Sequence, residues 1–243
     1  MQTVQPNSTL VSPRPFSEQS APMSIVNRVV AEFVGTATLL IAVVGSGIQA
    51  ERLSPGDSGL ALLENSIATG VTLVAVILAL GPISGAHLNP LVTLADTVLG
   101  STKARAVLPY IVAQFIGGGV GAVLANLMFG LPAVEISQKQ RSSIGLWLAE
   151  AIATFGLVVV IYGVIRSGRA SAAPYAVGAY IAGAYWFTAS TSFANPAVTL
   201  ARTLSDTFSG IQPSSTGPFI AAQVVGAIVA VLFTRFLYRS HRP

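Results

Sequence analysis

Long apolar runs alternate with short polar segments along this chain. Six of the runs reach or approach the length that a helix needs to cross a hydrocarbon core about 30 Å thick. They cover approximately residues 28–50, 60–80, 106–129, 144–165, 174–189 and 219–238, and the fifth is the shortest. The pattern predicts six transmembrane helices joined by short connections.

Two shorter segments share a second pattern. Residues 84–91 (SGAHLNPL) follow the second run, and residues 192–198 (SFANPAV) follow the fifth. In each, Asn can cap a helix through its side-chain oxygen while Pro takes the first helical position, where its missing N–H costs nothing. A helix from residue 89 to about residue 99 would be about 16 Å long, roughly half of the hydrocarbon core. We therefore expect two re-entrant half-helices, which begin at Asn89, Pro90 and Leu91 and at Asn195, Pro196 and Ala197.

The two halves of the chain repeat one another. Glu32 in the first run corresponds to Glu150 in the fourth, and Asn89 corresponds to Asn195. Three spans per half is an odd number, so the second half must enter the membrane from the opposite side. The sequence predicts an inverted repeat, with halves at about residues 25–129 and 143–238.

Composition agrees with a membrane location. The chain of 243 residues is 52% hydrophobic and 9% charged, against about 25% charged in an ordinary soluble domain. The net charge of +4 does not indicate nucleic acid, since no basic patch or cluster of stacking aromatics accompanies it. We expect a disordered N-terminal tail over residues 1–24, one membrane domain over 25–238 and a short C-terminal tail over 239–243.

The positions of Lys and Arg predict the orientation. If both termini lie on one side, that side collects nine of the 13 basic residues, and the positive-inside rule makes it cytoplasmic. We therefore expect a multi-pass protein of the inner (plasma) membrane with both termini in the cytoplasm. The nine are Arg14, Arg28, Lys103, Arg105, Arg166, Arg169, Arg235, Arg239 and Arg242.

Half-helices that enter from opposite faces would meet near the midplane, with their positive N-terminal ends directed at the same spot. Interrupted helices are tolerated in a membrane only where they are buried or line a water-filled cavity. Asn89 and Asn195 keep free N–H donors, and the stretches 81–88 and 189–194 are expected to expose carbonyl acceptors. The pattern predicts a polar, uncharged, single-file path.

These residues resemble a known family. Residues 84–90 are similar to the first signature loop of the aquaporins and aquaglyceroporins, the major intrinsic proteins, and residues 195–197 are similar to the second. The resemblance covers about residues 26–237. It implies an all-α, right-handed aquaporin-like bundle that is a passive channel in the lipid bilayer and not an enzyme, forms homotetramers and needs no cofactor. Selectivity in such pores depends on diameter, lining groups and half-helix dipoles.

Three further side chains are candidates for supporting roles. Glu32 and Glu150 are carboxylates inside spans, where ionisable groups are functional by default. The resemblance implies that they brace the carbonyl-bearing loops by accepting hydrogen bonds from backbone N–H groups. His87 is predicted to brace loop carbonyls as well, and no metal site is expected around it because no other ligand residue lies near it in sequence.

The resemblance also implies a narrow selectivity filter of four residues. Counting back 20 from Asn89 gives Thr69, where the family has a large aromatic, and counting back 12 from Asn195 gives Gly183. The second loop contributes Ser192 and Val198, the latter at a position that is normally Arg. These side chains predict a filter wider than that of a water channel and without its fixed charge. Only Arg202 lies near enough in sequence to replace that charge.

Residues 192–208 are similar to those of a bacterial subgroup associated with arsenic-resistance operons. This implies passage of small neutral solutes: arsenite as As(OH)3, polyol-like solutes such as glycerol, methylated arsenicals and water. One alternative is a water-selective or general aquaporin. A second, of a different class, is a coupled secondary transporter, which also uses inverted repeats. An intramembrane enzyme is not indicated, because no nucleophile and base are paired.

Overall fold

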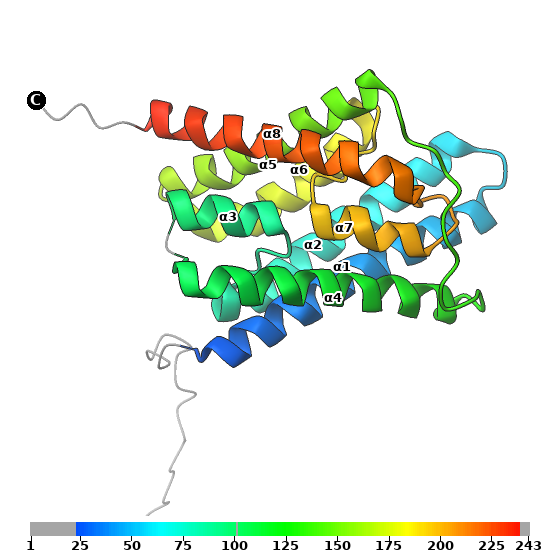
Figure 1. The fold of residues 1–243 in the computed structure, drawn as a ribbon, viewed down its shortest axis with the longest axis horizontal. Helices are drawn as coiled ribbons and strands as arrows, with labels where there is room; N and C mark the ends of the chain where they lie inside the picture. Colours follow the sequence, from blue (N-terminus) through cyan, green and yellow to red (C-terminus); the bar gives the residue numbers. More distant parts are fainter. Residues whose placement is uncertain (1–22, 101, 239–243) are drawn as a thin grey trace, which may run out of the picture.

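The computed structural model describes residues 23–100 and 102–238 (Figure 1). Apart from Met23 and Ser24, the two predicted tails lie outside these residues. The described chain consists of helices and loops, with no strand among them. The helices are α1 (Ile25–Leu53), α2 (Ser58–Ser84), α3 (Pro90–Leu99), α4 (Ala104–Met128), α5 (Ile144–Arg166), α6 (Ala173–Phe187), α7 (Pro196–Ala201) and α8 (Pro213–Leu237), with short 3-10 turns η1 (Ala170–Ala172) and η2 (Arg202–Leu204).

Six long helices occupy the six predicted spans. Within the described residues, five of them (α1, α2, α4, α5 and α8) are long and apolar enough to cross a membrane. The sixth, α6, has 15 residues, about 22 Å at 1.5 Å per residue, so it is the shortest span, as its sequence predicted.

The two halves of the chain pack in the same order. Helix α1 contacts α2 and α4, and its counterpart α5 contacts α6 and α8. The halves join through α2 and α6, while the short helices α3 and α7 each touch both α4 and α8. The start of α1 and the end of α8 lie at the same end of the bundle (Figure 1).

The half-helices α3 and α7 lie roughly end to end, with their N-termini near the middle of the bundle (Figure 1). Each begins as the sequence predicted. The Asn89 side-chain oxygen accepts a hydrogen bond from Leu91 N–H at 2.9 Å, and the Asn195 oxygen accepts from Ala197 N–H at 3.0 Å and Val198 N–H at 3.3 Å. Helix α7 has only 6 residues against 10 in α3, and it continues into the 3-10 turn η2.

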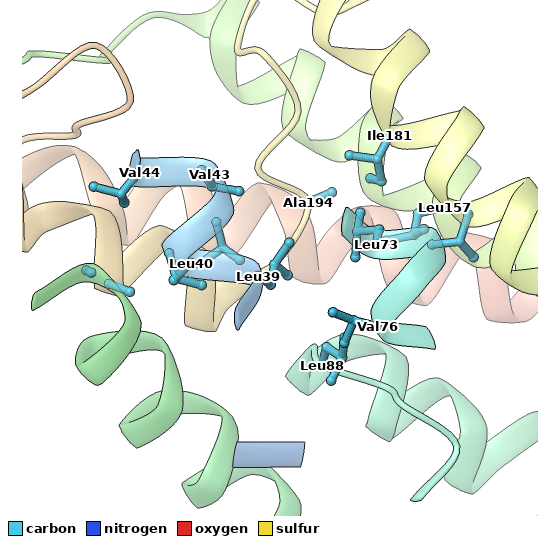
Figure 2. Close-up of a cluster of buried hydrophobic side chains, with 14 of the residues drawn as sticks. Leu39, Leu40, Val43, Val44, Leu73, Val76, Leu88, Leu157, Ile181 and Ala194 are labelled. Atoms are coloured by element: carbon cyan, nitrogen blue, oxygen red, sulfur yellow. The ribbon is translucent and has the colours of Figure 1, made fainter. Parts of the chain in front are cut away.

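The apolar core surrounds the place where the half-helices meet. Figure 2 shows Leu73 of α2, Leu157 of α5 and Ile181 of α6 beside one another, close to Ala194 of the second loop. Leu39 and Val43 of α1 belong to the same cluster. The apolar side chains of both halves therefore form the walls of the central region rather than a layer separate from it.

Glycines set how closely the long helices approach. A Cβ atom on Gly121 of α4 would clash with the Ala37 carbonyl oxygen of α1, and one on Gly226 of α8 would clash with the Ala151 carbonyl oxygen of α5. Small residues allow this contact between backbones, which provides much of the attraction between helices in a membrane.

We expect Gly121→Val to separate α1 from α4 and to lower the thermal unfolding temperature of the protein in detergent by about 2–12 °C, since overpacking costs about 1–3 kcal/mol. Gly119→Val is the matched control in the same helix, because the nearest atom to a Cβ there is 3.9 Å away. Equal losses from the two substitutions would contradict this account of the α1–α4 contact.

Candidate functional site

Glu150 of α5 is fully buried and holds the loop that precedes α7. Its two carboxylate oxygens accept hydrogen bonds from Phe193 N–H and Ala194 N–H, both at 2.9 Å. Gln223 of α8 donates to the same carboxylate at 2.6 Å and also to Thr199 Oγ1 at 2.9 Å. The loop is therefore tied to two transmembrane helices through one side chain.

Glu32 of α1 does the same for the loop that precedes α3. It is also fully buried, and its oxygens accept from His87 N–H at 2.9 Å and Leu88 N–H at 2.8 Å. Gln114 of α4 donates to it at 2.8 Å and to Thr93 Oγ1 at 3.0 Å. Both glutamates thus make the contacts that bracing a loop requires, and the repeated arrangement reflects the repeat seen in the sequence.

The braced loops have an unusual backbone. Ala86, Leu88, Ser192 and Ala194 have φ angles between 45° and 52°, a left-handed region that costs non-glycine residues about 1 kcal/mol each. Of these residues, Leu88 donates its N–H to Glu32 and Ala194 donates its N–H to Glu150, which fixes both in this conformation. Such strain persists only where the surroundings enforce it, and it is typical of functional sites.

The two loops that precede α3 and α7 are linked by a pair of hydrogen bonds, one donated by the Asn at the end of each loop. The Asn89 amide donates to the Ala194 carbonyl at 2.8 Å, and the Asn195 amide donates to the Leu88 carbonyl at 2.7 Å. Each amide nitrogen carries two hydrogens. One hydrogen of each Asn therefore joins the loops, and the other is left for a molecule between them.

A cavity of about 490 Å³ runs past this point. It is lined by Met23, Arg28, Thr102 and Ala173 at the end that carries the termini, and by both Asn89 and Asn195. Of the four predicted filter residues, Thr69, Ser192 and Val198 line it. Pro90, Leu91, Pro196, Ala197, Glu32 and Glu150 are not in its lining and lie buried behind it.

Gly183, the fourth predicted filter residue, does not line the cavity. It is exposed on the outer side of α6, a Cβ atom there would meet nothing within 4 Å, and it is not part of the cavity wall. On the same helix Tyr185 is buried, lines the cavity and shares a hydrogen bond of 3.2 Å with Thr69. The prediction counted 12 residues back from Asn195, whereas the residue of α6 that faces the cavity lies two residues later in the chain.

The predicted carbonyl stretches are also shorter than expected on the first side. Gly81 and Ser84 are still within α2, which ends only where Gly85 takes a left-handed conformation with φ of 92°. Pro82 does not end the helix earlier, because it falls in its last turn. Non-helical backbone is therefore limited to residues 85–89 before α3, and to residues 188–195 before α7.

His87 faces side chains rather than loop carbonyls. Its Nδ1 lies 3.2 Å from Thr93 Oγ1, and its Nε2 lies 3.7 Å from a carboxylate oxygen of Asp96, which also lines the cavity. Asp96 in turn accepts from Tyr162 OH at 2.9 Å. Our sequence analysis assigned Asp96 no role, although a carboxylate on a half-helix could have drawn attention to it.

Three basic residues gather at the other end of the cavity. Arg141 donates to the Gly210 carbonyl at 2.9 Å and the Ser190 carbonyl at 3.3 Å, and Lys139 donates to the Phe208 carbonyl at 2.7 Å. Arg202 is 1% exposed and lines the cavity. Burial, with Arg141 and Arg202 close by, lowers the pKa of Lys139 to about 8.

The chain matches one protein family and is similar to several known proteins. The model of the family described as "Major intrinsic protein" matches residues 19–192. The chain is 48% identical over 219 residues to the aquaglyceroporin AqpS of Rhizobium meliloti (strain 1021), covering 90% of this chain and 93% of that protein. It is 30% identical to the aquaporin AqpM of Methanothermobacter marburgensis, covering 88% and 98%. The solved structure of the aquaglyceroporin from Plasmodium falciparum matches 90% of this chain and 98% of its own with a TM-score of 0.69 at 23% identity, a likeness of fold.

Proposed function

Because the chain belongs to the major intrinsic protein family, a family of non-enzymatic membrane channels, we propose that it conducts small neutral solutes passively: arsenite as As(OH)3 and polyols such as glycerol, with methylated arsenicals and water as further permeants. The observation that carries this proposal is the cavity between the N-termini of α3 and α7, which both Asn89 and Asn195 line. Two positive helix ends at one spot oppose cations, while the remaining amide hydrogens suit uncharged oxygen-rich molecules.

The lining of the cavity supports hydroxylated solutes in particular. Thr69, Tyr185 and Ser192 place hydroxyl groups in its wall, and Val198 and Leu39 supply apolar surface. A polyol or As(OH)3 can exchange its hydration for these hydroxyls while its less polar side rests on the apolar residues. With 48% identity, the aquaglyceroporin AqpS adds weight to solutes larger than water.

Two alternatives follow from particular features. Tyr185, with its large side chain, lines the cavity and Gly183 does not, which favours a water-selective pore. Asp96 and His87 form a titratable pair in the cavity wall, which is the feature closest to a coupled transporter. A passive pore is distinguished from a transporter by a low activation energy and by flux that stays proportional to the gradient.

We further propose a homotetramer in the inner membrane with both termini in the cytoplasm. Arg28, Lys103, Arg105, Arg166 and Arg235 of the described residues lie at or near the ends of helices on the side that carries the termini, as the positive-inside rule requires. Many large apolar side chains of α2, α4, α5 and α8 are exposed on the single chain, which suits lipid and neighbouring subunits.

The proposal is tested with the purified chain in proteoliposomes. Stopped-flow light scattering would compare entry of arsenite and of glycerol with osmotic water flow, each against empty vesicles. Entry of both solutes well above the empty-vesicle rate, with a low activation energy, is the expected result. Fast water flow without solute entry would replace the proposal with a water channel, and flux that saturates or follows an ion gradient would replace it with a transporter.

A further inference from the structure

Residue 198 stands where the family resemblance leads us to expect an arginine. It is a valine, so this position of the filter carries no charge. Val198 is in α7, four residues before Arg202. Four residues are about one helical turn, so the two side chains project from the same side of the segment, about 6 Å apart along its axis. An arginine at 202 can therefore reach the lumen to which Val198 contributes.

The surroundings of Arg202 hold its side chain in that direction. Its guanidinium carbon lies 3.5 Å from the centre of the Phe193 ring, and its Nε donates to the Ser209 carbonyl. Arg202, Phe193, Ser192 and Val198 all line the cavity. Among residues 23–100 and 102–238, no acceptor is found for the two terminal nitrogens of Arg202. These donors are therefore fixed by stacking and one hydrogen bond while still able to bind a solute.

A second polar group beside them is also without a partner. The Ser192 hydroxyl oxygen is buried, with the residue 3% exposed, and it makes no hydrogen bond within the described part of the chain. A buried polar group left unpaired costs about 1–3 kcal/mol. The oxygen itself is buried, so it gains the missing hydrogen bond from a passing solute by rotation about the Cα–Cβ bond toward the cavity that Ser192 lines.

We infer that Arg202, displaced one helical turn outward from the family's usual position, provides the fixed positive charge of the filter and binds solute oxygens together with Ser192. This inference rests on the proposed channel function and specifies how the filter admits neutral solutes while it excludes cations. Val198 leaves room at the inner level, and Arg202 opposes protons and other cations at the outer level. The filter thus has two levels instead of one.

The neighbouring charges are consistent with a positive outer level. Lys139 and Arg141 lie close enough for their charges to act on one another, and the lowered pKa of Lys139 reflects both nearby arginines as well as burial. Arg141 stacks on the same Phe193 ring at 5.1 Å and is also buried, so it adds positive charge to this level from behind the cavity wall.

The test measures proton flux into proteoliposomes under an imposed membrane potential, together with glycerol and arsenite entry in the same vesicles. Arg202→Gln, which keeps a donor for the Ser209 carbonyl but loses the charge, is expected to raise proton flux about tenfold. Arg202→Lys should change it less than about twofold, since the charge remains. The double variant Val198→Arg/Arg202→Val should restore low proton flux, because the charge returns to the filter at residue 198. It should also slow solute entry, because the larger side chain narrows the inner level.

Arg52→Gln, which removes an exposed arginine of the α1 C-terminus that is not part of the cavity wall, is the control and should leave proton flux within about twofold of wild type. Unchanged proton flux in folded Arg202→Gln, or an equal rise in Arg52→Gln, would overturn the inference. If the Arg202→Gln protein aggregates during purification, Arg202→Met is measured instead. A rise in proton flux again supports the inference, and unchanged proton flux overturns it. Wild-type vesicles that admit neither solute would instead overturn the proposed function, so the two failures are distinguishable.

Discussion

Replacing Glu150 with alanine is expected to abolish the folded channel. The substitution removes both acceptors of the Phe193 and Ala194 N–H groups and one acceptor of Gln223, all of them buried. Each buried donor left unpaired costs about 1–3 kcal/mol, so the total is a large part of an ordinary stability of about 5–15 kcal/mol. It also removes the hydrogen bond that holds Ala194 in its left-handed conformation.

The measurement is the yield of monodisperse protein in detergent, followed by its thermal unfolding. Glu150→Gln should fall between wild type and Glu150→Ala, since its amide keeps one oxygen acceptor and presents a donor to the other N–H group. Glu135→Ala, which removes an exposed carboxylate from the loop between α4 and α5, is the control and should behave as wild type. Normal yield and unfolding temperature for Glu150→Ala would show that the loop before α7 keeps its shape without the brace.

Val198→Arg is expected to lower glycerol and arsenite flux about tenfold or more and water flux by less. The side chain at 198 is 5% exposed and lines the cavity next to Asn195. A guanidinium there narrows the lumen at its inner level, and each tenfold loss of rate corresponds to about 1.4 kcal/mol of added barrier. Water is smaller than either solute and passes a constriction that excludes them.

Val198→Leu separates size from charge in this experiment. It adds bulk without a positive group, so solute flux should fall moderately and the ratio of solute to water flux should lie between wild type and Val198→Arg. The readout is stopped-flow light scattering at equal protein content per vesicle. A parallel loss of water and solutes in Val198→Arg would mean that residue 198 does not shape the narrow part of the pathway.

The fold could be predicted in outline because its signals are local. Length and apolarity specify each spanning helix, and an Asn-Pro pair starts a helix whatever surrounds it, as the caps at Asn89 and Asn195 show. The repeat was visible for a related reason. A carboxylate inside an apolar run is too costly to keep without buried partners, so Glu32 and Glu150 marked matching places in the two halves.

The composition of the filter could not be predicted by counting along the chain. Counting from Asn195 does not say which face of α6 a residue occupies, and a step of two residues exchanges exposed Gly183 for Tyr185, which lines the cavity, because a helix turns by about 100° per residue. The pairing of His87 with Asp96 could not be predicted from the sequence either. It depends on where the loop before α3 places the His87 side chain relative to that helix.

The sequence by itself determined that this protein spans a membrane with an inverted repeat and two Asn-capped half-helices, since hydrophobic periods and caps act over a few residues. Only the tertiary structure decided which side chains face the lumen. Tyr185, Ser192 and Arg202 come from α6, the second loop and η2, and their directions depend on loop lengths, on left-handed backbone and on the stacking of Arg202 against Phe193. Those contacts join residues of separate elements, and no local pattern encodes them.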